Sequence, residues 1–166
     1  MKNIRSIYFA LAILLLVVSS EKFSIGSYST GPIPGTVIDS DTGLIWTVCS
    51  MGQTPPTCPE NATTDTWRNA LAYCSGLTLG GVAWRLPNIK ELFTIINYYY
   101  EAPAVAGSAF PHTPGHDFAY YWTSTTHPSI FAPGGRDRAM LVDFDLGGSD
   151  DDLKSGQHYV RCVTGP

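Results

Sequence analysis

The chain has 166 residues, of which 44% are hydrophobic, 12% aromatic and only 14% charged, and its formal net charge is −4. An acidic chain without a basic run does not favour nucleic acid, an anionic membrane surface or a sulfated polysaccharide as its main partner. Its four cysteines include no C-x-x-C pair, so they indicate two disulfide bonds and not a metal centre or a redox motif.

The first twenty residues have the pattern of a secretory signal peptide. Lys2 and Arg5 precede an apolar run over residues 7–18, and small residues follow it. The run is shorter than the roughly 20 residues that span a bilayer, and no other stretch approaches that length. We therefore expect a secreted or periplasmic protein that is soluble once residues 1–20 are removed, with an uncleaved membrane anchor as the alternative. Cleavage would leave eight basic and fourteen acidic residues, a net charge of about −6.

The mature chain is predicted to consist of an arm and one domain. Residues 21–36 are rich in Gly, Ser and Pro without a sustained period, which is typical of a linker or a loosely attached arm. Residues 37–166 are long enough for a single domain, which begins with a β-hairpin over residues 37–48. In the hairpin turn, Gly43 can adopt positive φ and the aspartates can bond turn amides.

A first helix is predicted over residues 65–75. Its apolar positions recur at helical spacing and are Trp67, Ala70, Leu71 and Cys74. Thr64 or Asp65 would cap its first turn, and Gly76 would close its C-terminal end.

The stretch WRLPNIKEL, residues 84–92, predicts the start of a second helix. Pro87 holds the entry extended, while Asn88 and Glu91 have the spacing of a capping box. Behind this cap runs an apolar stripe of Ile89, Leu92, Phe93, Ile96 and Tyr99. Arg85 stands between apolar neighbours, so we expect it to bind a carboxylate or a carbonyl in a structural role.

Three strands are predicted over residues 120–125, 139–146 and 159–163. Residues 147–156, with three consecutive aspartates, are expected to form a solvated acidic loop. Four cysteines allow three pairings. We favour Cys49–Cys58 across a short loop and Cys74–Cys162 between the first helix and the last strand, because Cys74 faces inward.

Two long, weakly patterned connections, residues 98–120 and 127–138, are the predicted binding surface, because connections of this length are commonly functional. Tyrosines there could stack on sugar rings or on apolar partner surface. Histidine, aspartate and arginine side chains would supply hydrogen bonds. The candidates are Tyr98, Tyr100, His112, His116, Asp117, Tyr120, Arg136 and Arg138.

Some histidines and aspartates of the chain could be read as metal ligands. His112 and His116 are separated by Pro114 and Gly115, which prevents a zinc-protease helix, although a loop metal site with Asp117 is an alternative. The weak calcium candidates are Asp143, Asp145 and Asp150, which lack the spacing of an EF-hand. We assign no catalytic residue, no metal and no cofactor, and expect calcium binding to be weak or absent.

Six short motifs occur in an order that we recognise. They are Asp39 with Thr42-Gly43-Leu44 and Trp46, Trp67 with Ala70 and Tyr73-Cys74, Gly80-Gly81 with Trp84-Arg85-Leu86-Pro87, Tyr121 to Thr125, Val142-Asp143-Phe144, and Tyr159 to Val163. This arrangement resembles the Lcl C-terminal domain family, named for a collagen-like bacterial surface protein. The resemblance implies an α+β fold that varies the C-type lectin-like domain, with two helices flanking a small, mostly antiparallel sheet and long loops on one face.

We consider three functions for a chain with this resemblance. The first is a secreted or periplasmic, non-catalytic binding or adhesion module that holds a glycan or a protein partner on its long-loop face. The second is an exported enzyme on a scaffold like the formylglycine-generating enzymes, which share the WRLP turn. Those enzymes use a cysteine pair late in the domain, where this chain has only Cys162. The third is a structural subunit of a surface assembly. The oligomeric state stays open.

Overall fold

The computed structural model describes residues 27–116, 118–128 and 135–166 of the chain. The signal peptide expected at residues 1–20 and the first part of the arm lie outside these residues. Among the residues described, no helix has both the length and the apolar character needed to cross a membrane. This part of the chain forms an α+β fold with two α-helices, two sheets of mostly antiparallel strands and two disulfides.

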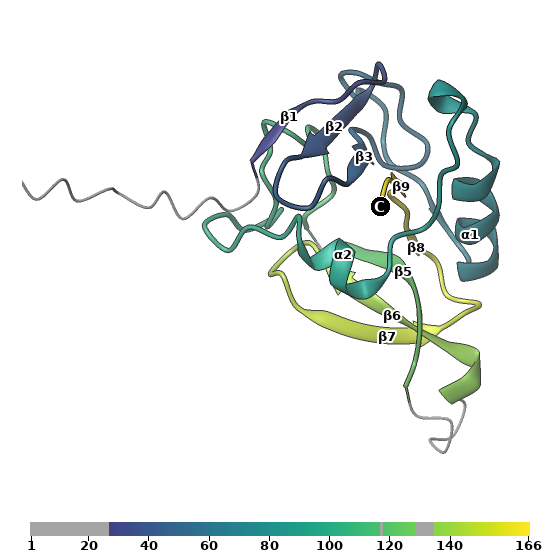
Figure 1. Cartoon of the computed structure of the whole chain (residues 1–166). Coiled ribbons are helices and arrows are strands. Elements are labelled where there is room, and N and C mark those ends of the chain that lie inside the picture. Colours follow the sequence, from purple (N-terminus) through teal and green to yellow (C-terminus); the bar gives the residue numbers. More distant parts are fainter. Residues whose placement is uncertain (1–26, 117, 129–134) are drawn as a thin grey trace, which may run out of the picture.

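The first sheet consists of β1 (Tyr28–Thr30), β2 (Thr36–Asp39), β3 (Ile45–Thr47) and β9 (Val163–Thr164), in that order (Figure 1). β2 and β3 pair antiparallel, which confirms the predicted hairpin. Its turn has the expected chemistry, since Asp39 accepts a hydrogen bond from the amide of Asp41 and Gly43 has a φ of 72°. β1 comes from the arm and pairs with β2, so part of the arm is an edge strand.

The second sheet consists of β4 (Thr64–Asp65), β8 (His158–Tyr159), β5 (Tyr120–Thr126), β6 (Arg138–Asp143) and β7 (Ser149–Leu153), in that order. β5 and β8 are parallel, and the other pairs are antiparallel. β5 and β6 confirm two predicted strands. β6 ends at Asp143, earlier than expected, because its carbonyl accepts the amide of Gly147 and closes a tight turn.

Two predictions about the C-terminal part of the chain were wrong. The expected acidic loop contains β7, which pairs with β6 along its whole length. The expected single strand over residues 159–163 divides between β8 and β9, because the chain crosses from one sheet to the other at residues 160–162. All three crossing residues are buried, so Arg161 points into the protein and not to one face of a continuous strand.

Helix α1 (Trp67–Gly76) confirms the first predicted helix but begins two residues later than expected. The predicted caps, Thr64 and Asp65, instead belong to β4, and the observed N-cap residue Thr66 makes no side-chain capping bond. Two short 3-10 helices, Leu79–Gly81 and Gly135–Asp137, also occur in the described residues.

Helix α2 (Ile89–Phe93) has the predicted capping box. The side chain of Asn88 accepts the amide of Glu91, and the Glu91 carboxylate accepts the amide of Asn88. The helix is shorter than the apolar stripe suggested, because Ile96 forms a β-bridge with Val105 and the chain turns away. Tyr99, the last predicted position of the stripe, is therefore 80% exposed.

Both predicted disulfides are present. Cys49–Cys58 closes a local loop, and Cys74–Cys162 joins α1 to the segment that crosses between the sheets, over a sequence separation of 88. The core packs around two fully buried tryptophans, Trp46 in the first sheet and Trp122 in the second. Val105 and Phe110, from the first long connection, are buried in the same core cluster as Trp46.

Candidate functional site

The two long connections lie at opposite ends of β5. One leads into β5 at Tyr120, and the other leaves it after Thr126. A seven-residue strand at about 3.3 Å per residue separates its ends by about 20 Å, so the points at which the two connections join β5 lie far apart. Of the candidates that the structure describes, only His112 and His116 line the same pocket.

The arginine candidates belong to the second connection. Arg138 forms an ion pair with Asp151 of β7 and also donates to the Asp151 carbonyl, so its guanidinium is occupied within the sheet. Arg136 is exposed, and its carbonyl accepts a hydrogen bond from Lys154 Nζ. Residues 129–134 of this connection, like the candidate Asp117 of the first, lie outside the described residues.

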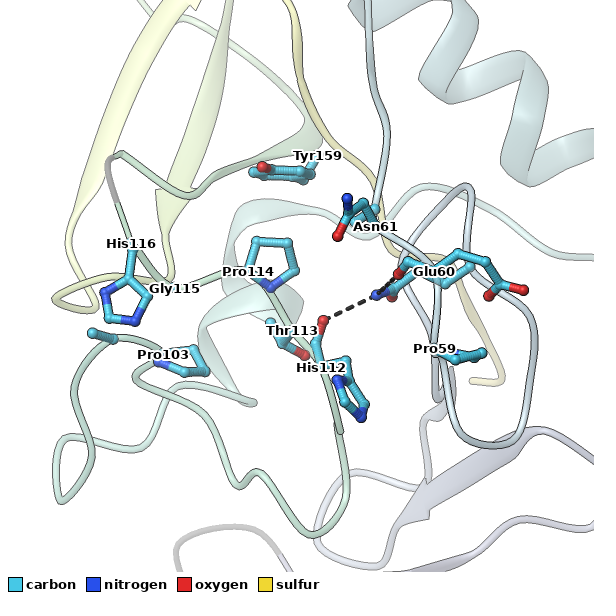
Figure 2. A pocket seen from close by; sticks show the side chains of 13 residues that line it. Pro59, Glu60, Asn61, Pro103, His112, Thr113, Pro114, Gly115, His116 and Tyr159 are labelled. Atoms are coloured by element: carbon cyan, nitrogen blue, oxygen red, sulfur yellow. Dashed lines mark hydrogen bonds between the residues drawn. The ribbon is translucent and has the colours of Figure 1, made fainter.

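A pocket of about 430 Å³ lies between the first long loop and the segment that follows Cys49 (Figure 2). Two predicted residues, His112 and His116, line it from opposite sides of Pro114. Tyr159 and Asn61 lie above Pro114 in the view of Figure 2, whereas His112 lies below it. The full lining is Gln53, Pro59, Glu60, Asn61, Ala62, Ala102, Pro103, His112, Thr113, Pro114, Gly115, His116 and Tyr159.

Gln53 fastens the two walls of the pocket to each other. Its Nε2 donates to the carbonyl of Glu60 at 3.0 Å and to the carbonyl of His112 at 3.0 Å (Figure 2). Its Oε1 accepts the amide of Ser50 at 2.9 Å. The Cys49–Cys58 disulfide restrains the same wall, so the pocket is held by a covalent bond and by a side chain that spans both walls.

The first loop approaches the backbone of residues 102–103 very closely at Gly115. A Cβ at this position would lie 2.2 Å from the nitrogen of Pro103, which no rearrangement of a side chain could relieve. Gly115 therefore allows this close contact between two parts of one loop. It places His116 beside Pro103 in the wall of the pocket.

The buried guanidinium of Arg161 anchors the loop from inside the protein. It donates to the carbonyl of Thr47 at 2.8 Å and to the hydroxyl of Thr113 at 2.8 Å, and it lies 4.7 Å from the ring centre of Phe110. These acceptors are neutral, so burial lowers the pKa of Arg161 below its ordinary value. Thr113 lines the pocket, which makes Arg161 a support of its floor.

The tyrosine candidates lie outside the pocket. Tyr98 and Tyr100 are 71% and 56% exposed. Tyr120 is half-buried, and its ring stacks on that of Phe118 with centres 6.1 Å apart. Burial, followed by the nearby carboxylates of Asp150 and Asp143, raises the pKa of Tyr120 above its ordinary value of 10.0.

Asp143 and Asp150, two of the weak calcium candidates, each accept a hydrogen bond from a backbone amide one or two residues further along the chain. Asp143 Oδ1 accepts the amide of Asp145 at 2.8 Å, and Asp150 Oδ1 accepts the amide of Asp151 at 2.8 Å. In the part of the chain that the structure describes, no group of three or more His, Cys, Asp or Glu side chains is arranged to hold a metal ion. The loop alternative for a metal involved Asp117, which lies outside that part.

Sequence reasoning found the two histidines but missed Gln53, Asn61 and Tyr159. Tyr159 was assigned only to a strand, and Asn61 was not among the candidates. The prolines and the disulfide around residues 49–58 were a signal that this segment is held rigidly, but nothing in the sequence indicated which loop it faces.

Comparison with known proteins identifies one family. Residues 35–164 match the family model described as the Lcl C-terminal domain. No curated protein matches the chain.

Proposed function

This chain belongs to the Lcl C-terminal domain family, and from that premise we propose that it is an exported, non-catalytic binding or adhesion module. Two disulfides that use all four cysteines support export, because such bonds persist in oxidising compartments. The apolar segment at residues 7–18 would direct it there. We also propose that the fold is a variant of the C-type lectin-like fold. The Cys74–Cys162 disulfide, which joins α1 to the segment that crosses between the sheets, supports this.

The proposed ligand of the pocket is a glycan without acidic substituents. The observation that carries this proposal is the pocket itself, whose volume of about 430 Å³ falls in the range of small-molecule sites. Tyr159 offers an aromatic ring, while Asn61, His112 and His116 offer donors and acceptors. The acidic balance of the chain and Glu60 at the rim favour a neutral sugar over a sulfated one.

Two other functions compete with this proposal. In an oxidase that resembles the formylglycine-generating enzymes, a reactive cysteine would be needed. Cys162 is buried and paired with Cys74, so it is not a free thiol, and this supports the proposed non-catalytic module over the oxidase. A structural subunit of a surface assembly would need no ligand in the pocket, so a binding measurement separates it from the proposed module.

The test is a screen of the exported protein on a glycan array, followed by calorimetry with the best neutral sugar. Asn61→Ala and His116→Ala should each lower the affinity by about tenfold or more, because each removes a polar group that orients the ligand. Asn69→Ala on α1 is the matched control and should leave affinity unchanged. The melting temperature of each variant should stay close to that of the parent.

Binding of no glycan would overturn the proposal. So would an equal loss of affinity in Asn61→Ala and Asn69→Ala, since the effect would then not depend on the pocket.

A further inference from the structure

Five large apolar side chains are exposed around one turn at the end of β6. They are Tyr98, Tyr99, Tyr100, Phe118 and Leu146, each between 56% and 80% exposed. We call this set the aromatic surface. Among the described residues, it contains five of the eight exposed large hydrophobic side chains. An apolar group of this size on one side of a protein is characteristic of an interaction site, whereas single exposed residues are ordinary.

Backbone hydrogen bonds show that these side chains belong to one surface. The turn at residues 144–148 lies in the middle. On one side, the amide of Ala102 donates to Asp145 at 3.0 Å and that of Ala104 to Phe144 at 2.7 Å. On the other side, the amide of Phe144 donates to Ala119 at 3.0 Å. The segments that carry the tyrosines and Phe118 therefore flank the same turn.

Tyr98 lies directly on this turn. Its hydroxyl donates to the carbonyl of Gly147 at 3.1 Å. A Cβ at Gly147 would lie 2.7 Å from Cε1 of the Tyr98 ring, so the ring contacts the backbone there. Gly147 also has a φ of 81°, which favours glycine. The exposed ring is thus held in place by a hydrogen bond and a close contact, which reduces the entropy that binding would cost.

The aromatic surface is bordered by carboxylates. Asp143, Asp145 and Asp150 all raise the pKa of Tyr120, after burial as the largest cause, so their field reaches the ring that stacks on Phe118. Glu101 follows the three tyrosines directly in the chain. The only arginine of β6, Arg138, is at the opposite end of that strand and is paired with Asp151.

We propose that the aromatic surface docks a protein segment that presents lysine or arginine side chains next to apolar ones. Charge complementarity selects this partner, because cations are attracted both by the faces of tyrosine rings and by the surrounding carboxylates. The apolar side chains of the partner would cover Leu146 and Phe118. This surface is separate from the glycan pocket, since none of its five side chains lines that pocket.

The probe is a fluorescent synthetic peptide of alternating lysine and leucine, with a glutamate and leucine peptide of the same length for comparison. Anisotropy at about 50 mM salt should show binding of the lysine peptide alone, and added salt should weaken it. The double substitution Asp145→Asn and Asp150→Asn should weaken binding by about tenfold or more. Asparagine keeps the side-chain acceptor that Asp150 offers to the amide of Asp151.

Two matched controls isolate the surface from the net charge of the chain. Asp137→Asn, at the other end of β5, should leave the affinity for the peptide unchanged. Tyr99→Ala should weaken binding at least fivefold, because it removes a ring that is 80% exposed, whereas Tyr73→Ala on α1 should not. Asn61→Ala should leave peptide binding unchanged, so this proposal and the glycan proposal can fail separately.

Equal binding of both peptides, or failure of the lysine peptide to bind, would overturn the proposal. An equal effect of Asp137→Asn and the double substitution would show attraction by total charge alone, and that also overturns it.

Discussion

The carboxylate of Glu91 completes two structural interactions at once. Its two oxygens accept hydrogen bonds from Nη1 and Nη2 of Arg85 at 2.7 and 2.8 Å, and one of them also accepts the amide of Asn88 at 2.7 Å. The first is a bidentate ion pair, and the second is half of the capping box of α2. Arg85 therefore has the structural partner that we expected for it.

These interactions make the stability of the protein depend on pH. Burial raises the pKa of Glu91, but the hydrogen bonds from Arg85 and Asn88 outweigh it and hold the pKa below the ordinary value of 4.5. A carboxyl group with a lowered pKa stabilises the fold fully above its unfolded pKa. That contribution is lost as the pH falls through the folded pKa.

Glu91→Gln should therefore lower the free energy of unfolding by about 1 kcal/mol at neutral pH, where the cap and the ion pair are both weakened. The difference between variant and parent should shrink as the pH falls below 4.5. Urea unfolding at a series of pH values measures it, with Glu101→Gln as the control for the same change in charge. A constant difference across all pH values would contradict this account.

At the scale of elements, β7 is an edge strand whose outward backbone groups at Asp151 and Leu153 are already bonded. In its register with β6, the amides of Asp150 and Asp152 point towards β6, so those of Asp151 and Leu153 point away. Each of these outward amides donates to the carboxylate of the aspartate before it, at 2.8 and 2.7 Å.

The outward carbonyls of Asp151 and Leu153 are bonded as well. Arg138 Nη2 donates to the carbonyl of Asp151 at 2.7 Å, and the amide of Gly156 donates to that of Leu153 at 2.7 Å. An edge strand with free groups is a template for pairing with other chains. Two of the three consecutive aspartates therefore have a structural explanation: Asp150 and Asp152 bond outward amides of this edge.

Removing the acceptors should open this edge. The double substitution Asp150→Ala and Asp152→Ala should cause concentration-dependent association, because two outward amides lose their acceptors. The matched variant with asparagine at both positions loses the same charge but keeps an acceptor, and it should remain as soluble as the parent. Light scattering and thioflavin fluorescence would measure association. Equal behaviour of the two variants would show that charge, and not capping, protects the edge.

These elements show which parts of the fold could be predicted from sequence. The hairpin, the α2 cap and β5 depend on short-range signals such as Gly43, Asn88 and the alternation after Tyr120, and all three were predicted correctly. β7 was missed because three consecutive aspartates have no apolar alternation. Its strand conformation depends on pairing with β6 and on bonds that the aspartates make to their own backbone.

Only some residues of the pocket could be predicted from the sequence. His112 and His116 were found because they occur in an unusually long connection, which is visible in the sequence. Gln53 and Tyr159 come from distant parts of the chain, and only the assembled sheets bring them to the same place. The same is true of Arg161, whose burial follows from the crossing between sheets and not from any local pattern.

At the scale of the whole molecule, the two disulfides restrain loops of very different length. Cys74–Cys162 closes a separation of 88 residues, and Cys49–Cys58 one of nine. In the chain-entropy model, the long loop stabilises the fold by about 4 to 5 kcal/mol and the short one by about 2 to 3 kcal/mol.

Replacing Cys74 and Cys162 by alanine should therefore lower the free energy of unfolding more than replacing Cys49 and Cys58. Chemical denaturation of both double variants measures the two losses. The short disulfide restrains one wall of the pocket. Replacing Cys49 and Cys58 should therefore weaken glycan binding even though this variant loses less stability. A larger loss of stability from the short bridge would contradict the entropic explanation.

The long disulfide has a further consequence for a molecule under tension. If the described ends were pulled apart, the covalent path would run through the bond between Cys74 and Cys162 and would bypass the chain between them. The intervening residues 75–161, roughly 300 Å of extended chain, would carry no load. The pocket wall of the first long loop, β5, β6, β7 and the aromatic surface all belong to that bypassed chain. An oxidised molecule could yield at its N-terminal strands while the aromatic surface and the first-loop wall of the pocket stayed out of the line of force. The opposite wall, which carries Asn61, precedes Cys74 and would bear the load.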